Sequence, residues 1–164
     1  MGKVDTQIIE IMGRNRLANE LLAAGIEIAL PMRDRGIDLI AYIDIDGEIP
    51  QFTAIPIQMK ASSGSNFTIN QKYQKFLPNL VIVFVWGVMS ENKEDQATYA
   101  LTQEESLIIA EAMGYAQTPS WLEHGLYTST RPSQKLLELM KPYQMDSTAW
   151  RRKIIRLSRT AISD

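Results

Sequence analysis

The chain has 164 residues, of which 45% are hydrophobic and 22% are charged, values usual for one soluble globular domain. It contains no cysteine and one histidine, which excludes disulfides, thiol chemistry and zinc sites built from several Cys or His side chains. The net charge of -2 argues against a surface that is basic all over, although it is compatible with a local basic patch. Because no apolar run has transmembrane length and residues 1–5 lack a signal-peptide core, we expect no membrane segment and a cytoplasmic location.

A first helix is predicted over residues 5–24, since this stretch lacks proline and is followed by Gly25 as a stop signal. Its apolar residues spread widely around the helical wheel, which predicts packing on more than one side. Gly13 weakens the middle of this helix by about 1 kcal/mol relative to alanine. A short strand, residues 26–30, follows and is closed by Pro31.

Two apolar runs, residues 36–43 and 52–60, flank a turn signal at Asp46-Gly47. This arrangement is typical of a hairpin of two buried strands. The further predicted elements are helical turns at 70–76, a fully buried central strand at 80–86, a strand at 98–101, and helices at 102–114, 133–140 and 150–163, with a loop-like stretch at 115–132. The predicted fold is therefore one α/β domain with a mixed central sheet of four or five strands flanked by helices. Residues 1–101 form its core and residues 102–164 a helical C-terminal extension packed on that core.

Three polar side chains interrupt the apolar background of the hairpin: Asp38 in its first strand, and Gln58 and Lys60 at the end of the second. Gln58 and Lys60 are two residues apart, so on a strand both point to the same face. Charged side chains are rarely buried without a partner, and the pattern therefore indicates either a functional site or a buried structural ion pair between Asp38 and Lys60.

Asp38 followed by Gln58-Met59-Lys60 resembles the active-site pattern of the PD-(D/E)XK nuclease superfamily, which includes restriction endonuclease-like folds and archaeal Holliday junction resolvases. The family pattern is an acid on one strand, then acid-X-lysine on its hairpin partner. Gln58 stands where the second acid is usual, a variant that the Mrr-like branch carries. The resemblance covers residues 1–101 and implies a restriction endonuclease-like core.

The resemblance implies Mg²⁺-dependent hydrolysis of DNA, with Mn²⁺ as a substitute metal. Asp38, Gln58 and the backbone carbonyl of Met59 would bind the metal, and Lys60 would be the catalytic lysine. In this family a glutamate on the first helix often faces the metal, which makes Glu20 a candidate ligand that would restore the charge missing at Gln58. The alternative for Glu20 is a solvated or locally paired helical glutamate.

Several basic side chains are candidates for contacts with phosphates. These are Arg33 and Arg35 in the turn before Asp38, Lys72 and Lys75 after the motif, and Arg152, Arg156 and Arg159 on one face of the last helix. The alternative for the last three is a solvated face that balances acidic neighbours. Cutting both strands of a duplex with one site per chain would favour a homodimer.

Two functions from different classes follow from these patterns. The first is a divalent-metal-dependent endodeoxyribonuclease. The second is a weak or inactive protein on a nuclease fold that binds nucleic acid or another protein, because Gln58 adds no negative charge and fold similarity does not guarantee activity.

Overall fold

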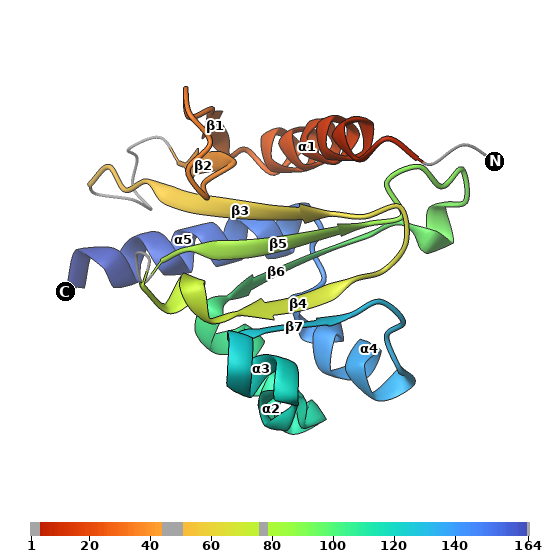
Figure 1. The fold of residues 1–164 in the computed structure, drawn as a ribbon. Coiled ribbons are helices and arrows are strands. Elements are labelled where there is room, and N and C mark those ends of the chain that lie inside the picture. Colours follow the sequence, from red (N-terminus) through yellow and green to blue (C-terminus); the bar gives the residue numbers. More distant parts are fainter. Residues whose placement is uncertain (1–3, 44–50, 76–78, 164) are drawn as a thin grey trace.

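A five-stranded mixed sheet forms the centre of the molecule (Figure 1). The computed structural model describes residues 4–43, 51–75 and 79–163. In spatial order the strands are β1 (Glu27–Ala29), β2 (Leu39–Tyr42), β3 (Ile55–Ala61), β5 (Val81–Trp86) and β6 (Ala97–Thr102). β3 and β5 are parallel and the other neighbours antiparallel. The predicted fold class, a mixed sheet flanked by helices, is confirmed.

The antiparallel pairing of β2 with β3 is the hairpin that the two apolar runs predicted. Its predicted turn at Asp46-Gly47 lies outside the described residues. Leu39 pairs with Ile57, and Asp38, directly before β2, donates its N–H to the carbonyl of Ile57 at 2.8 Å. In this register Asp38 lies opposite Gln58, so the two polar positions meet across neighbouring strands.

All six residues of β5 are buried, as predicted for the central strand. Alternate side chains enter two separate cores. Val81, Val83 and Val85 belong to the core under α1 (Thr6–Ala23) and α5 (Ser147–Ser163), whereas the intervening Ile82, Phe84 and Trp86 belong to the core on the opposite face.

Only one side of α1 packs on the sheet, and the expectation of packing on more than one side is wrong. Asp5 caps the helix by accepting a hydrogen bond from the N–H of Gln7, and the buried positions Gly13, Leu17 and Leu21 recur every fourth residue. Nothing among the described residues covers the opposite side, where the exposed apolar side chains are Ile8, Ile11, Met12 and Leu22. The wide spread of apolar residues therefore reflects one buried and one exposed apolar stripe.

The second face of the sheet is covered by α2 (Gln103–Met113), α3 (Pro119–His124), α4 (Gln134–Met140) and a two-stranded ribbon of β4 (Phe67–Asn70) and β7 (Leu126–Ser129) (Figure 1). Short 3-10 helices lie at η1 (Gln71–Lys75), η2 (Lys93–Asp95), η3 (Tyr115–Gln117) and η4 (Lys141–Tyr143). The predicted capping box is present at the start of α2: Thr102 and Glu105 bond reciprocally to each other's backbone N–H.

The prediction of a loop over residues 115–132 is wrong, because this stretch contains α3 and β7. Thr118 caps α3 and Pro119 occupies its first turn, which is a recognisable helix start. β7 pairs with β4, about sixty residues earlier in the chain, so nothing local marks either strand. The segment after Leu101 thus adds a strand as well as helices. Its α5 shares a core with α1, and its α2 and α4 fill the other core.

No helix among the described residues combines the length and the apolar character needed to cross a membrane.

Candidate functional site

A cleft of about 370 Å³ lies where the N-terminal half of α1 passes the C-terminal half of β3. Residues from the first helix, the loop before β2, β3 and the start of β4 line it. They are Thr6, Glu10, Asp34, Asp38, Gln58, Met59, Lys60, Ala61, Ser62, Asn66 and Thr68. The structure thus brings Asp38, Gln58, Met59 and Lys60 to one cleft.

Asp38 is largely buried in this cleft and is held there by hydrogen bonds. The residue is only 9% exposed, and its Oδ2 accepts a hydrogen bond from the N–H of Met59 at 2.7 Å. The preceding loop turns at Gly36, whose φ of 89° favours glycine and whose N–H is bound by the side chain of Asp34. This turn returns the chain so that Asp34 lies beside Asp38.

The amide of Gln58 marks a point that attracts positive charge. Its Nε2 donates to Asp38 Oδ2 at 2.8 Å and to the carbonyl oxygen of Met59 at 3.2 Å. A carboxylate and a backbone carbonyl are the oxygen ligands that hard divalent cations prefer. The NH₂ group lies between two such ligands, and half a turn of the amide would bring Oε1 to the same point as a third.

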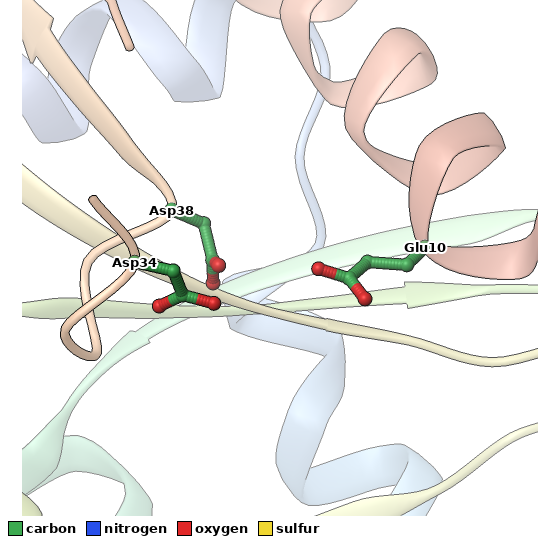
Figure 2. Close-up of side chains that lie close together, drawn as sticks. All are labelled: Glu10, Asp34 and Asp38. Atoms are coloured by element: carbon green, nitrogen blue, oxygen red, sulfur yellow. The ribbon is translucent and has the colours of Figure 1, made fainter. Parts of the chain in front are cut away.

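Asp38 also belongs to a cluster of three carboxylates in this cleft. Ligand oxygens of Glu10, Asp34 and Asp38 all lie within 4.8 Å of one another, and Figure 2 shows Glu10 reaching from α1 toward the two aspartates. Burial raises the pKa of the Asp38 carboxyl, and the charges of Asp34 and Glu10 raise it further, against the opposing effects of the Met59 N–H and of Arg14. Unneutralised carboxylates at this spacing repel one another, so the cluster is compatible with a divalent metal ion.

Glu20 does not belong to this cluster, which corrects the expectation that it faces the metal. Its carboxylate accepts hydrogen bonds from the hydroxyl of Thr98 at 2.8 Å and from Nε1 of Trp150 at 3.2 Å. Arg16 lies 3.6 Å from it. Glu20 is therefore the locally paired glutamate of the alternative interpretation, and it joins α1 to β6 and α5. The glutamate of α1 that reaches Asp34 and Asp38 is Glu10.

Lys60 lines the cleft on the same face of β3 as Gln58. Its Nζ lies 5.7 Å from the ring centre of the buried Tyr73, and Nζ of Lys72 lies 5.2 Å from the same ring. Both distances are within cation–π range, so one aromatic ring holds two ammonium groups near the cleft. Among the described residues Asp38 and Lys60 form no ion pair, and the alternative of a buried Asp38–Lys60 pair is not what the structure contains.

The other basic candidates fall into two groups. Arg33 and Arg35 are exposed in the loop that carries Asp34, and Lys75 is exposed on η1 next to Lys72. None of the α5 arginines lines the cleft. Arg152, Arg156 and Arg159 are exposed on α5, and Arg156 binds Glu105 at 3.0 Å, so part of this face balances an acidic neighbour.

No family model matches the chain, and no curated protein matches it either. One similar solved structure is that of a bacterial homing endonuclease, with 13% sequence identity, a TM-score of 0.50 and an alignment that covers 100% of both chains. The chain has the fold of that nuclease. The structural similarity extends over the entire chain. It therefore includes residues 102–164, which the resemblance to the nuclease superfamily in the sequence does not cover.

Sequence reasoning missed two of the clustered acids, Glu10 and Asp34. Asp34 lies in the turn before Asp38, and this turn also presents its carboxylate to Asp38. For Glu10 a signal existed in Gly13, one turn later. A glycine inside a helix often has a packing reason, and here the contact of Gly13 with Ala61 places the preceding turn, which carries Glu10, at the cleft.

A larger cleft, of about 940 Å³, lies on the other side of the β3–β4 loop. Its charged lining is Glu94, Asp95, Glu138 and Lys141, and its floor contains Trp86 and Tyr99. It contains none of the motif residues, so its size does not make it the better candidate for the chemistry.

Proposed function

We propose that this protein is a divalent-metal-dependent endodeoxyribonuclease of the PD-(D/E)XK type. The observation that carries the proposal is the geometry around the Gln58 amide, where a carboxylate oxygen of Asp38 and the carbonyl of Met59 converge within hydrogen-bonding distance. Glu10 and Asp34 add negative charge beside Asp38, and Lys60 lines the same cleft. The fold shared with a bacterial homing endonuclease supports DNA as the substrate.

The residues present fit Mg²⁺ or Mn²⁺. Asp38 and the carbonyl of Met59 would hold the ion, Gln58 would add Oε1 after its amide turns, and Glu10 and Asp34 would bind it directly or through water. A bound divalent ion would lower the pKa of a water molecule and neutralise charge that develops on the phosphate. Glu10, rather than Glu20, replaces the negative charge that a second acid at position 58 would supply.

The chain's own side chains would then orient the reactants. Lys60 positions the attacking water or stabilises the charge on the phosphate oxygens, because its ammonium group lies on the same face as Gln58. The ring of Tyr73 restricts where Lys60 and Lys72 place their charges, and Lys72 binds the phosphate backbone beside the cleaved bond. Contacts from Arg33, Arg35 and Lys75 extend this surface at the rim. Any contact from Arg152, Arg156 or Arg159 falls on phosphates outside the cleft.

A second function, DNA binding without cleavage, is favoured by one specific observation. The NH₂ of Gln58 donates to both expected ligands of the metal, and a neutral amide binds a cation less tightly than a carboxylate. In a protein that only binds DNA, this hydrogen-bonded arrangement would persist and the lysines would still contact phosphates.

Cleavage of supercoiled plasmid with Mg²⁺ or Mn²⁺ tests the proposal. We expect metal-dependent cutting by the wild type, a loss of at least about a hundredfold in Lys60→Ala, as general acid–base and electrostatic groups typically contribute, and unchanged cutting in Lys93→Ala as a control lysine outside the cleft. Equal cutting by wild type and Lys60→Ala would exclude Lys60 from the chemistry. Binding of the same plasmid without cutting in either metal would favour the second function.

A further inference from the structure

The outward side of α1 carries exposed apolar side chains near both ends of the helix, with Asn15, Ala18 and Asn19 between them. Ile8, Ile11, Met12 and Leu22 are each about half exposed there, and Val4 is similarly exposed just before the helix. Figure 1 shows α1 at the edge of the fold, with no other described element on its outward side. Apolar side chains scattered singly on a surface need no explanation, but side chains that recur on one side of a helix at a regular spacing indicate a binding surface.

The spacing of the stripe is that of a two-stranded coiled coil. Along the exposed side, Ile8, Ile11, Asn15, Ala18 and Leu22 follow one another at intervals of three, four, three and four residues. This is a heptad pattern, with Ile8, Asn15 and Leu22 at a positions and Ile11 and Ala18 at d positions. The pattern is independent of the chain's own core, which the same helix fills with Gly13, Leu17 and Leu21 from its other side.

Asn15, at the centre of the stripe, favours a second copy of the same helix as the partner. In an apolar seam its amide needs another hydrogen-bonding group, and a parallel copy of the same helix in register would bring Asn15 against its own counterpart. An antiparallel pair, in which a positions layer against d positions, would instead bring Asn15 against Ile11 or Ala18 and leave the amide unmatched.

Charge supports the same partner. No charged side chain of α1 lies in the stripe, and the charged side chains already pair within the chain: Glu10 with Arg14 at 3.2 Å and Arg16 with Glu20 at 3.6 Å. In a parallel pair the g position Arg14 faces the e position Asn19 of the other copy, so no like charges meet. A strongly charged partner finds no complementary charge on this stripe.

We propose that α1 forms the interface of a parallel two-fold homodimer, with Ile8, Ile11, Asn15 and Leu22 in its seam. Glu10 lies in the N-terminal half of the same helix, on the side that faces the cleft, so a parallel arrangement brings the two clefts to the same end of the dimer. If the proposed nuclease function holds, the two sites can act on the two strands of one duplex. The interface itself depends only on the surface of α1.

Sedimentation equilibrium without DNA or metal measures the interface directly. We expect the wild type to have the mass of a dimer and Ile11→Glu to have half that mass. Ile108→Glu is a matched control, because Ile108 on α2 is 57% exposed and Ile11 is 56% exposed, and it should remain a dimer. A monomeric wild type at every concentration, or a dimeric Ile11→Glu with native circular dichroism, would overturn the proposal.

The direction of the helices can be read from single cysteines, because the chain has none of its own. In a parallel pair Ile8→Cys faces its own counterpart and should form an intermolecular disulfide on mild oxidation, whereas Ile108→Cys should not. A dimer in which Ile8→Cys fails to crosslink would refute the parallel arrangement. These measurements also separate the dimer proposal from the nuclease proposal. If the nuclease proposal is wrong, no variant cuts DNA, but the masses and crosslinks stay as expected for the dimer.

Discussion

Gly13 of α1 lies directly against Ala61 of β3: a Cβ atom at position 13 would be 2.6 Å from the Cβ of Ala61. The same added atom would also touch Met59 and Val88 at 3.6 Å. Real Cβ atoms do not approach so closely, so only glycine permits this contact. The approach brings α1 onto the residue that follows Lys60, and it holds Glu10, one turn earlier on the helix, beside Asp38.

Gly13→Ala is therefore expected to destabilise the fold, although alanine favours helices by about 1 kcal/mol over glycine. Forcing a methyl group into a tight contact typically costs about 1–3 kcal/mol, and here it would also move Glu10 away from Asp38. Urea unfolding should give a lower free energy of unfolding, and calorimetric titration should give weaker Mn²⁺ binding. The double variant Gly13→Ala/Ala61→Gly removes the clash and should recover metal binding; failure to recover would mean that the contact does not set the position of Glu10.

Glu10→Gln and Glu20→Gln should have opposite consequences. Glu10 belongs to the carboxylate cluster, so Glu10→Gln should weaken Mn²⁺ binding about tenfold or more with little effect on stability in the absence of metal. Glu20 binds Thr98, Trp150 and Arg16, so Glu20→Gln should leave metal binding intact and lower the free energy of unfolding by about 1–2 kcal/mol. Titration calorimetry and urea unfolding of both variants check this. Weaker metal binding in Glu20→Gln alone would return the ligand role to Glu20.

The raised pKa of Asp38 predicts a pH dependence of stability in the absence of metal. Burial, with Asp34 and Glu10 adding to it, raises the pKa in the folded state above that in the unfolded state, so the folded state binds its proton more tightly. Stability should therefore fall as the pH rises from the unfolded pKa through the folded pKa. Asp38→Asn should flatten this dependence and be more stable than the wild type at neutral pH.

Bound metal should reverse the order of stability of the wild type and Asp38→Asn. A divalent cation binds the ionised carboxylate, so Mn²⁺ should raise the thermal midpoint of the wild type at neutral pH and leave Asp38→Asn nearly unchanged. The midpoint shift in the wild type should disappear as the pH falls and Asp38 binds a proton. Equal stabilisation of both proteins by Mn²⁺ would mean that the metal binds elsewhere.

Lys153 of α5 is buried against Glu105 at the start of α2, and the two residues tie the last helix to the second face of the sheet. Lys153 is 6% exposed, and its Nζ lies 2.6 Å from Oε2 of Glu105. Burial alone would raise the pKa of Glu105, but the hydrogen bonds from Lys153 and from the Thr102 N–H outweigh it and lower the pKa. This contribution to stability should be complete above the unfolded pKa of glutamate and lost as the pH falls through the lowered folded pKa.

Removing Glu105 should destabilise the protein more than removing Lys153. Glu105→Ala leaves the ammonium of Lys153 buried without its carboxylate and removes the capping box of α2, at a cost of about 3–5 kcal/mol. Lys153→Met replaces the charge with an apolar side chain of similar length, while Arg156 still binds Glu105, and should cost less than about 1.5 kcal/mol. Urea unfolding of both variants measures the difference. Equal losses would show that the pair itself, rather than the unpaired charge, determines stability.

Local patterns in the sequence are enough to predict the strands of the central sheet and the part of the cleft that contains Asp38, Gln58 and Lys60. The continuous apolar run of β5, the capping box of α2 and the two runs of the hairpin each depend on neighbours within a few residues. Asp38 and Gln58 meet because antiparallel pairing of adjacent strands brings them together, and a period of two puts Lys60 on the same face as Gln58. Each of these relationships follows from backbone geometry over a short stretch.

The position of Glu10 in the cleft and the pairing of β4 with β7 depend on contacts between distant segments. Glu10 and Glu20 are about 15 Å apart along one helix and equally plausible from their spacing alone. The fit of Gly13 on Ala61 decides which of them meets Asp38, and that fit exists only when α1 packs on β3. The pairing of β4 with β7 likewise joins Phe67 to Ser129. Such long-range contacts carry no local pattern, because their stability comes from shape and burial in the assembled core.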